Sequence, residues 1–328
     1  MTAWLGIDVS KKKFDVRVEW DGRTRAKVFA NDPDGWQRLC TWLESLGIGH
    51  VHAGLEATGR YGEGLALALH ERGHRVSLIN PARIKHFART KLGRNKTDTL
   101  DAALIGEYVR LFTPAIWVPP APAVRRLRDL VRTREALKAS VTEWRNRGGA
   151  GTLAEAADGA IRRVIEGLEE ELDALDGAIE ATIAGDAELR RRHDLLVSVP
   201  GVGTLTAAAI LTELPGCDVL QSAREAAAYA GLNPSQHRSG ASERPARISR
   251  IGNASLRTAL FFPALAGMRC NPAVKALRER LMAQGRLKPK QILVAAMRKM
   301  LHLCYGVLKT GRPFDAHHVT NLGPAAPA

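Results

Sequence analysis

The sequence predicts an α/β domain followed by a mostly α-helical half, with a long helical, coiled-coil segment joining the two. Over residues 1–118, short apolar or alternating runs typical of strands alternate with stretches of helical periodicity. Beyond the proline-rich stretch at 117–122, helical periodicity dominates. The 328 residues are enough for two domains with their own cores. The expected divisions are 1–118, 119–190, 191–312 and a disordered tail at 313–328.

Strand signals open the chain. The apolar run at 4–9 ends in an aspartate, and residues 14–20 alternate between apolar and polar. Asp21-Gly22 favours a tight hairpin turn into a third strand at 25–30. The elements after it alternate in type: helix 32–46, strand 50–56, helix 61–72, strand 75–79 and helix 81–89. This order predicts an α/β sheet that begins with an antiparallel meander.

Two aspartates three residues apart, Asp98 and Asp101, open the next segment. Apolar residues then recur with a helical period, at Leu100, Leu104, Ile105, Tyr108 and Leu111. Residues three apart on a helix share a face, so both carboxylates point the same way. Mg²⁺ prefers such hard oxygen ligands. Acidic residues also favour the first turn of a helix, so a structural cap is the alternative explanation.

Two further acids, Asp8 and Glu56, each end a predicted strand. Functional groups in open α/β sheets gather at the carboxyl ends of the strands. These two acids and the aspartate pair would therefore bring four carboxylates together from three elements. Convergent acids in a basic protein are typical of a two-metal phosphoryl-transfer centre, with Mg²⁺ or Mn²⁺ as the cation. We therefore favour a metal site over a helix cap.

The net charge of +14 and a pI near 10.0 predict a polyanionic partner, nucleic acid before membrane. Residues 234–312 hold 16 Lys/Arg against two acidic residues, whereas residues 150–233 hold 15 acids against six Arg. A second basic cluster lies at Arg125–Arg134. The candidate nucleic-acid ligands are Arg125, Arg126, Arg128, Arg132, Arg238, Arg244, Arg247, Arg250 and Arg257.

The four cysteines show no zinc-binding spacing and indicate free thiols in a reducing cytosol. Neither a signal peptide nor a run of about 18 apolar residues is evident, so we expect a cytoplasmic protein without a membrane partner.

The middle of the chain predicts two long helices. Residues 123–147 form a basic helix that a glycine-rich stretch at 148–151 interrupts. Apolar residues then step by four and three over about three heptads: Ile161, Ile165, Leu168, Leu172, Leu175 and Ile179. This seam fits a dimerising coiled coil and an internal helical hairpin equally well.

The last third combines helices with two special connections. Val199-Pro200-Gly201-Val202-Gly203 separates two helices, as a phosphate-binding helix-hairpin-helix turn or as a packing turn would. A polar segment at 233–245 predicts a functional or disordered loop. Helices at 253–269, 272–284 and 289–309 follow, and disorder is expected from Gly311.

Seven motifs in order resemble the one-ten family of bacterial insertion-sequence transposases, over residues 4–309. They are G-I-D-V-S-K (6–11), L-E-A-T-G-R-Y (55–61), K-T-D-T-L-D-A (96–102), V-P-G-V-G (199–203), Y-A-G-L-N-P (229–234), R-S-G (238–240) and I-S-R-I-G-N-A-S-L-R (248–257). Arg250 departs from the family pattern, which has lysine there.

The resemblance implies a ribonuclease-H-like, RuvC-like first domain with a DEDD set of metal ligands: Asp8, Glu56, Asp98 and Asp101. It implies Ser239 as a nucleophile in the second domain. It also implies a recombinase guided by a structured non-coding RNA, the bridge RNA, that pairs with donor and target DNA. Because recombination joins two duplexes, we expect a homo-oligomer, either a dimer or a tetramer.

The serine assignment depends on the resemblance, since Ser235, Ser242 and Ser249 are rivals in the same segment. A serine nucleophile conserves phosphodiester energy as a phosphoserine link. Because Ser239 lies far along the chain from the acids, the two domains would have to form one composite site. Two other functions stay open: a RuvC-like junction endonuclease using water, and a non-catalytic nucleic-acid binder.

Overall fold

The computed structural model describes residues 3–57, 61–90, 98–149, 151, 154–217, 219–235, 238–239, 242–243, 247–248 and 252–316. For residues 98–100 and most of the short strands after residue 233, only the backbone is described. The chain forms two compact units, Met1–Pro119 and Pro120–Ala328.

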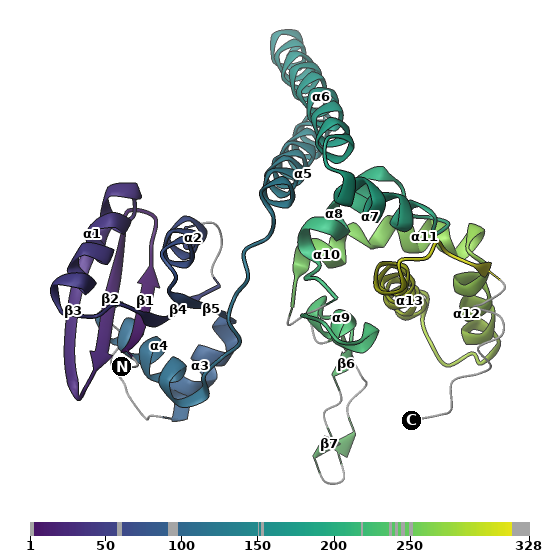
Figure 1. The fold of residues 1–328 in the computed structure, drawn as a ribbon. Coiled ribbons are helices and arrows are strands. Elements are labelled where there is room, and N and C mark those ends of the chain that lie inside the picture. The colour runs from purple at the N-terminus through teal and green to yellow at the C-terminus, as the bar shows by residue number, and fades with distance from the viewer. Residues whose placement is uncertain are drawn as a thin grey trace. The chain divides into compact units, whose positions relative to one another are not determined.

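The first unit is built on a mixed sheet with the order β3-β2-β1-β4-β5 (Figure 1). β1 pairs antiparallel with β2 and parallel with β4, so a meander leads into a parallel segment. The strands are β1 (Ala3–Val9), β2 (Lys13–Trp20), β3 (Arg23–Ala30), β4 (Val51–Glu56) and β5 (Arg75–Ile79). The predicted α/β sheet with its antiparallel start is confirmed.

Helices cover both faces of this sheet. Side chains of α1 (Pro33–Ser45) and α2 (Glu63–Glu71) share one core with Phe14, Val16 and Val18 of β2. On the other face, α3 (Pro81–Thr90) and α4 (Asp98–Phe112) form a second, smaller core. The polar residues of β2, Asp15, Arg17 and Glu19, therefore face α4, although their alternation alone would suggest a solvent-facing side.

Helix α4 packs directly on the sheet because two paired glycines leave room for it. Gly6 on β1 and Gly54 on β4 are register partners. A Cβ added at Gly6 would lie 1.9 Å from the carbonyl oxygen of Ala102, and one at Gly54 would lie 2.3 Å from Val109. The helix backbone thus reaches the strand backbone, a distance that only glycine permits.

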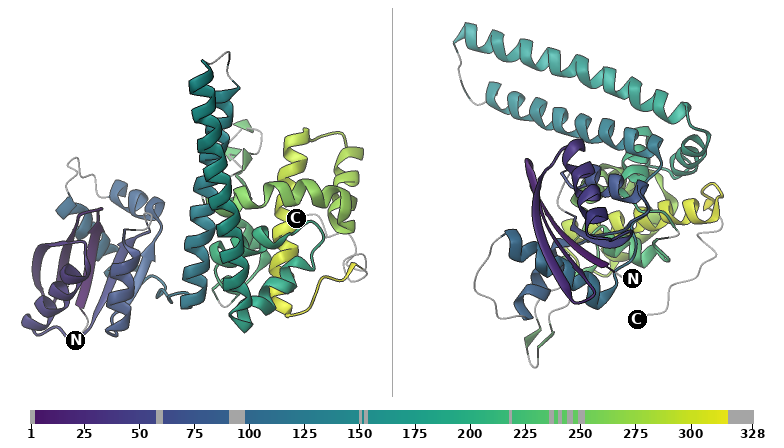
Figure 2. Two further views of the ribbon diagram at one scale, coloured as in Figure 1. Left: turned by 90° about the horizontal axis from the view of Figure 1, so that it is seen from above. Right: turned by 60° about the vertical axis from the view of Figure 1, so that its left-hand side comes forward.

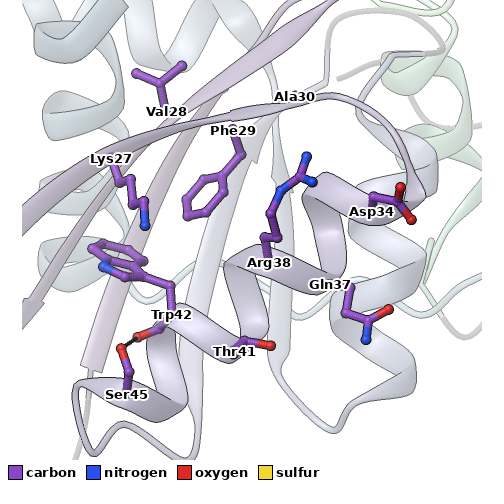
Figure 3. A pocket seen from close by; sticks show the side chains of 10 residues that line it. All are labelled: Lys27, Val28, Phe29, Ala30, Asp34, Gln37, Arg38, Thr41, Trp42 and Ser45. Atoms are coloured by element: carbon purple, nitrogen blue, oxygen red, sulfur yellow. Dashed lines mark hydrogen bonds between the residues drawn. The ribbon is translucent and has the colours of Figure 1, made fainter.

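A groove lies between helix α1 and the edge strand β3. It encloses about 720 Å³ and is lined by residues that include Lys27, Phe29, Arg38 and Trp42 (Figure 3). Helix α1 is anchored at this edge by Asp32, whose carboxylate accepts a 2.7 Å hydrogen bond from the Gly35 amide.

The second unit begins with a helical hairpin of α5 (Pro122–Gly148) and α6 (Glu155–Ala184), seen side by side in Figures 1 and 2. Arg134 of α5 pairs with Asp176 of α6, and Arg145 pairs with Glu169. The seam residues of α6 are half-buried, apart from Ile179, which is fully buried. Of the two alternatives given for this seam, a dimerising coiled coil and an internal helical hairpin, the hairpin is therefore present within one chain.

Seven further helices follow in the described part of this unit. They are α7 (Ala187–Val197), α8 (Thr204–Glu213), α9 (Ala223–Tyr229), α10 (Ala254–Ala259), α11 (Phe261–Cys270), α12 (Pro272–Ala283) and α13 (Pro289–Thr310). The single helix predicted over 253–269 is wrong, because it divides at Leu260 into α10 and α11. Pro263 lacks the amide that a continuous helix would bond to Ala259.

The glycine turn between α7 and α8 packs inward. A Cβ at Gly201, whose φ is +99°, would lie 3.1 Å from the Gly267 amide and from the Pro263 carbonyl oxygen of α11. The Asn271 side chain, which is fully buried, donates a 3.2 Å hydrogen bond to the Pro200 carbonyl. These contacts favour the packing turn over a phosphate-binding turn for this connection.

The segment after α13 differs from the predicted disorder at its start. Phe314 packs against the core of the second unit, and its amide donates a 2.8 Å hydrogen bond to Ser198 Oγ. An apolar ring with a hydrogen-bonded backbone gives residues 311–316 a fixed position. The remainder of the expected tail, 317–328, lies outside the described residues. No helix in the described part of the chain is long and apolar enough to cross a membrane.

Candidate active site

Asp8 and Glu56 lie on adjacent strands at the same edge of the sheet. They directly follow Ile7 and Leu55, the last register partners of the parallel strands β1 and β4. Each acid lies two residues after one of the paired glycines Gly6 and Gly54. Residues two apart on a strand share a face, so both acids lie on the face that α4 covers. Both side chains are partly exposed. Two carboxylates thus lie together where parallel strands end.

Helix α4 runs antiparallel to β1, which brings its first turn to this edge. Ala102 contacts Gly6, and Arg110 lies 3.6 Å from Glu19, the register partner of Trp4 at the opposite end of β1. The start of the helix, with Asp98 and Asp101, therefore points toward the carboxyl ends of β1 and β4. Asp101 is partly exposed, and the side chain of Asp98 is outside the described residues.

One acid at this edge escaped the sequence analysis. Asp15 of β2 is the register partner of Asp8, is only 6% exposed and lies 3.2 Å from Lys13 Nζ. The alternating pattern of β2 places Asp15 on its polar side, and nothing in that pattern indicates that a helix covers this side. Helix α4 supplies the cover, so the residue is buried beside the candidate centre.

The donor set fits a hard divalent cation in chemical type, because every candidate ligand is a carboxylate oxygen. Among the side chains that the structure describes, no three of His, Cys, Asp and Glu are grouped closely enough to hold a metal ion. Asp98, the fourth candidate ligand, is not among those side chains. Asp8 and Glu56 each have other polar partners within the chain.

Ser239 lies in a small β-ribbon rather than an irregular loop. β6 (Pro234–Ser235) pairs with β9 (Arg247–Ile248), and β7 (Arg238–Ser239) pairs with β8 (Ser242–Glu243). Ser239 pairs with Ser242, its rival as the nucleophile. Only the backbone of these two serines is described, and Ser249 lies outside the described residues. The backbone places Ser239 at the end of β7.

The base of this ribbon is held firmly. A Cβ at Gly252, whose φ is +147°, would lie 2.4 Å from the Tyr229 carbonyl oxygen, so the returning chain touches the outgoing one. The Asn253 amide donates a 2.8 Å hydrogen bond to that same carbonyl. Arg257 donates to the carbonyls of Ala230 and Gly252, at 2.9 and 3.3 Å. Both ends of the ribbon are thus joined before it leaves the helices.

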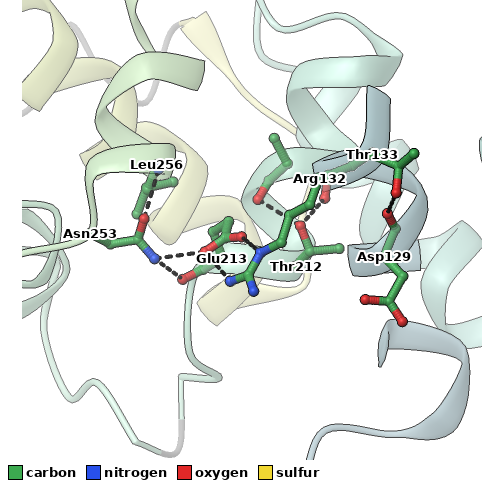
Figure 4. Close-up of polar contacts among 9 residues, drawn as sticks. Asp129, Arg132, Thr133, Thr212, Glu213, Asn253 and Leu256 are labelled. Atoms are coloured by element: carbon green, nitrogen blue, oxygen red, sulfur yellow. Dashed lines mark hydrogen bonds and ion pairs between the residues drawn. The ribbon is translucent and has the colours of Figure 1, made fainter. Parts of the chain in front are cut away.

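A buried carboxylate ties this base to the long helix α5 (Figure 4). Glu213, 6% exposed at the end of α8, accepts two hydrogen bonds from Arg132, at 2.7 and 3.2 Å. It also accepts a 2.8 Å hydrogen bond from Asn253 Nδ2, while Asn253 Oδ1 caps α10 through the Leu256 amide. Glu213 is not among the residues predicted from the sequence. The signal that could have indicated it is a single acidic residue at the end of an otherwise apolar helix.

The candidate nucleic-acid ligands differ in their surroundings. Arg132 and Arg257 use their guanidinium groups in the internal contacts just described. Arg125 and Arg128 are half-buried on α5, whereas Arg126 is exposed. The remaining four have no described side chain: Arg238, Arg244, Arg247 and Arg250. Of the described group, Arg126 is the most accessible to a phosphate.

Two family models match this chain over the regions that hold these features. Residues 5–150 match a model described as "Transposase". Residues 193–279 match one described as "Transposase IS116/IS110/IS902 family". The chain belongs to this transposase family. The first match contains the four acids, and the second contains the Ser239 ribbon and its base.

Relatives of this transposase match it over 71–95% of its length. It is 33% identical over 318 residues to the pilin gene-inverting protein of Moraxella bovis, covering 95% of this chain and 97% of the relative. It is 29% identical over 299 residues to the transposase for insertion sequence element IS1111A of Coxiella burnetii, covering 81% and 78%. A probable family 20 transposase of Pseudomonas aeruginosa is 30% identical over 266 residues, covering 71% and 75%.

Proposed function

We propose that this transposase is an RNA-guided DNA recombinase that cuts and rejoins strands of an insertion sequence and its target. In this proposal the first unit is a ribonuclease-H-like domain of the RuvC type. Asp8, Glu56, Asp98 and Asp101 would hold Mg²⁺ or Mn²⁺, and Ser239 would be the nucleophile. The observation that carries the proposal is the shared edge of Asp8, Glu56 and the start of α4, inside a chain of a transposase family.

Each group has a defined role in this chemistry. A divalent cation held by the four acids would neutralise charge on the phosphate and favour loss of the proton from an attacking hydroxyl. Ser239 Oγ forms a bond to phosphorus, the bond from phosphorus to one deoxyribose oxygen breaks, and that oxygen takes up a proton. The phosphoserine ester keeps the bond energy. Attack by a sugar hydroxyl from the other duplex then rejoins the strands and releases the serine.

The names of the relatives support the DNA-rearranging part of this proposal. One relative is named for inverting a pilin gene and another for transposing an insertion element. The excess positive charge supports nucleic-acid partners, which in the proposal are donor DNA, target DNA and the bridge RNA. The main alternative, a junction endonuclease that uses water, needs the same acids but no serine.

A covalent adduct separates the two possibilities. Labelled target DNA is incubated with protein, RNA and Mg²⁺, and denaturing electrophoresis is run for the wild type and for alanine variants of Ser235, Ser239, Ser242 and Ser249. We expect a wild-type adduct that Ser239→Ala alone abolishes while nucleic-acid binding persists. An adduct lost in a different variant moves the nucleophile there, and clean cutting without any adduct supports the endonuclease.

A further inference from the structure

The groove between β3 and α1 is a second charged and aromatic site, separate from the acidic edge. β3 is the edge strand of the sheet, so one side of the groove has no neighbouring strand. Lys27 and Phe29 enter it from β3, and Arg38 and Trp42 enter it from α1 (Figure 3). Val28 points to the other side of the strand. The acidic edge uses β1, β4 and α4, and none of these elements lines the groove.

The cations beside the groove form a row. Arg23, Arg25 and Lys27 are exposed and alternate along β3, so they share the face on which Phe29 lies. Arg38 adds a fourth cation from α1, with a side chain that is 60% exposed. The acids nearby are Asp34, in the lining, and Asp32, 3.9 Å from Arg38 and already bonded to the Gly35 amide. The positive charge exceeds the negative.

Aromatic rings form the floor between these cations. Phe29 is 6% exposed and stacks on Phe14 in the core, at 5.5 Å between ring centroids. Trp42 is half-buried and lies 5.8 Å from Phe29, so part of its ring faces the groove. Lys27 Nζ lies 5.3 Å from the Phe29 ring and 5.9 Å from the Trp42 ring. A flexible ammonium group thus covers an aromatic surface, which it can leave for a phosphate.

This combination identifies the class of ligand. A row of cations that follows the phosphate backbone, next to an aromatic face on which a base stacks, is how proteins bind single-stranded nucleic acid without reading its sequence. An added β-strand from another protein is the competing occupant of an edge strand. Repeated positive charge on the edge opposes such pairing. The groove therefore favours an unpaired polynucleotide over a protein strand.

We infer that the β3–α1 groove binds an unpaired stretch of a nucleic-acid strand, with phosphates along Arg23, Arg25, Lys27 and Arg38 and a base against Trp42. The inference rests on the proposed function only in requiring a nucleic-acid partner. It requires neither the metal centre nor Ser239. Guide RNA and displaced DNA offer the same chemistry, so the experiment includes both.

The test uses the full-length protein in EDTA, so that strand cleavage does not enter. Short oligouridylate and oligothymidylate probes carrying thio-substituted bases are photo-crosslinked, and the crosslinked peptides are mapped by mass spectrometry. We expect crosslinks in the peptide that contains Trp42. Trp42→Leu should lose these crosslinks and weaken probe binding roughly tenfold, whereas Trp42→Phe should retain both.

The charges have a separate readout. The double variant Lys27→Gln/Arg38→Gln should lower the slope of log affinity against log salt by about one to two, since each lost phosphate contact removes about 0.7 for a single strand. Arg162→Gln on α6, an exposed arginine of equal charge, is the control and should leave the groove crosslinks intact. Crosslinks confined to other regions with an unchanged slope would overturn the inference. Normal probe binding by the Trp42→Leu protein, together with a changed molecular mass in light scattering, would also overturn the inference.

Discussion

At the scale of single residues, the decisive feature is where carboxylates are placed. Asp8 and Glu56 each lie one residue beyond the last register pair of β1 and β4, so they share the sheet edge toward which α4 directs its first turn. Glu213 is different, because it is buried and bonded to Arg132 and Asn253 within the helical unit. In the proposed function Asp8 and Glu56 bind the metal ion, whereas Glu213 stabilises the helical unit through its two partners.

Asp8→Asn and Glu56→Gln should each abolish strand cleavage while leaving the fold intact, because each replaces a charged oxygen ligand by a neutral amide. Losing a direct ligand should cost more than the roughly 10- to 100-fold typical of residues that only support a ligand. Asp98→Asn and Asp101→Asn should behave alike, and EDTA should reproduce the effect. Cleavage rates and thermal unfolding are the measurements, with the exposed Glu71→Gln as control. Full activity in EDTA would contradict the metal centre.

Glu213→Ala should destabilise the helical unit, because it leaves Arg132 and Asn253 without their buried partner. Breaking a buried pair costs about 3–5 kcal/mol, and we expect about 2 kcal/mol here because Arg132 is 36% exposed. Denaturant unfolding measures the change. The control is Glu188→Ala. Glu188 and Arg191 form an exposed surface pair, so this substitution should have little effect on stability. Equal changes in stability for the two variants would contradict a structural role for Glu213.

At the scale of elements, the packing of α4 on β1 decides whether the acids meet. Helix propensity and strand alternation predict both elements, but neither predicts the distance between them. That distance is set by the facing glycines Gly6, Gly54 and Gly106, which let backbone approach backbone. The Ser239 ribbon illustrates the same point, because its two ends are brought together by Gly252 and Asn253.

Gly6→Ala should displace the start of α4, which carries Asp101, from the sheet edge that carries Asp8. The added methyl would lie 1.9 Å from the Ala102 carbonyl, so the backbone has to move. Overpacking of this kind costs typically 1–3 kcal/mol, and we expect metal-dependent cleavage to fall with it. Thermal unfolding and cleavage assays measure both effects. Gly49→Ala is the matched control, since nothing lies within 4 Å of its added Cβ.

The α5–α6 hairpin also bears on assembly. Apart from the buried Ile179, its seam residues are only half-buried within one chain, so they remain available to a second subunit. Leu168→Glu combined with Leu172→Glu should disperse a homo-oligomer that uses this seam, while both units stay folded. Light scattering measures the mass and circular dichroism the fold. An unchanged mass would assign the seam to the internal hairpin alone.

At the scale of the whole molecule, the uneven charge is the main feature. Residues 234–312 hold 16 Lys/Arg against two acidic residues, whereas residues 150–233, which include α6, hold 15 acidic residues against six Arg. Such an excess supports binding to nucleic-acid backbones with strong salt dependence, but it carries no sequence information. If specificity comes from a paired RNA, it should be possible to change it without changing the protein.

Altering the pairing loops of the guide RNA should therefore move the insertion site of the unchanged protein. The protein would bind the RNA through its shape and backbone and leave target reading to base pairing. Sequencing of insertion junctions after each RNA change provides the measurement, with a scrambled RNA as control. Insertion at the original site with every RNA would rule out guidance.

The sequence by itself determined the order of the elements, the class of each half and the candidate residues. Periodicity and turn chemistry are local, so the meander, the Asp98 helix and the long middle helices could be predicted from short windows. The single helix predicted over 253–269 is wrong at Leu260, and Pro263 is the sequence signal for that break. The candidate acids could be named from the sequence because strand ends and helix starts are readable there.

Only the tertiary structure decided how these pieces meet. It turned the polar side of β2 toward α4 and buried Asp15, because a helix from about eighty residues away covers that face. It engaged Arg132 with Glu213 instead of leaving it free for a phosphate, and it packed the 198–203 turn against α11. Each outcome depends on contacts between distant segments. Local propensity contains no information about such contacts, because burial and pairing are properties of the assembled fold.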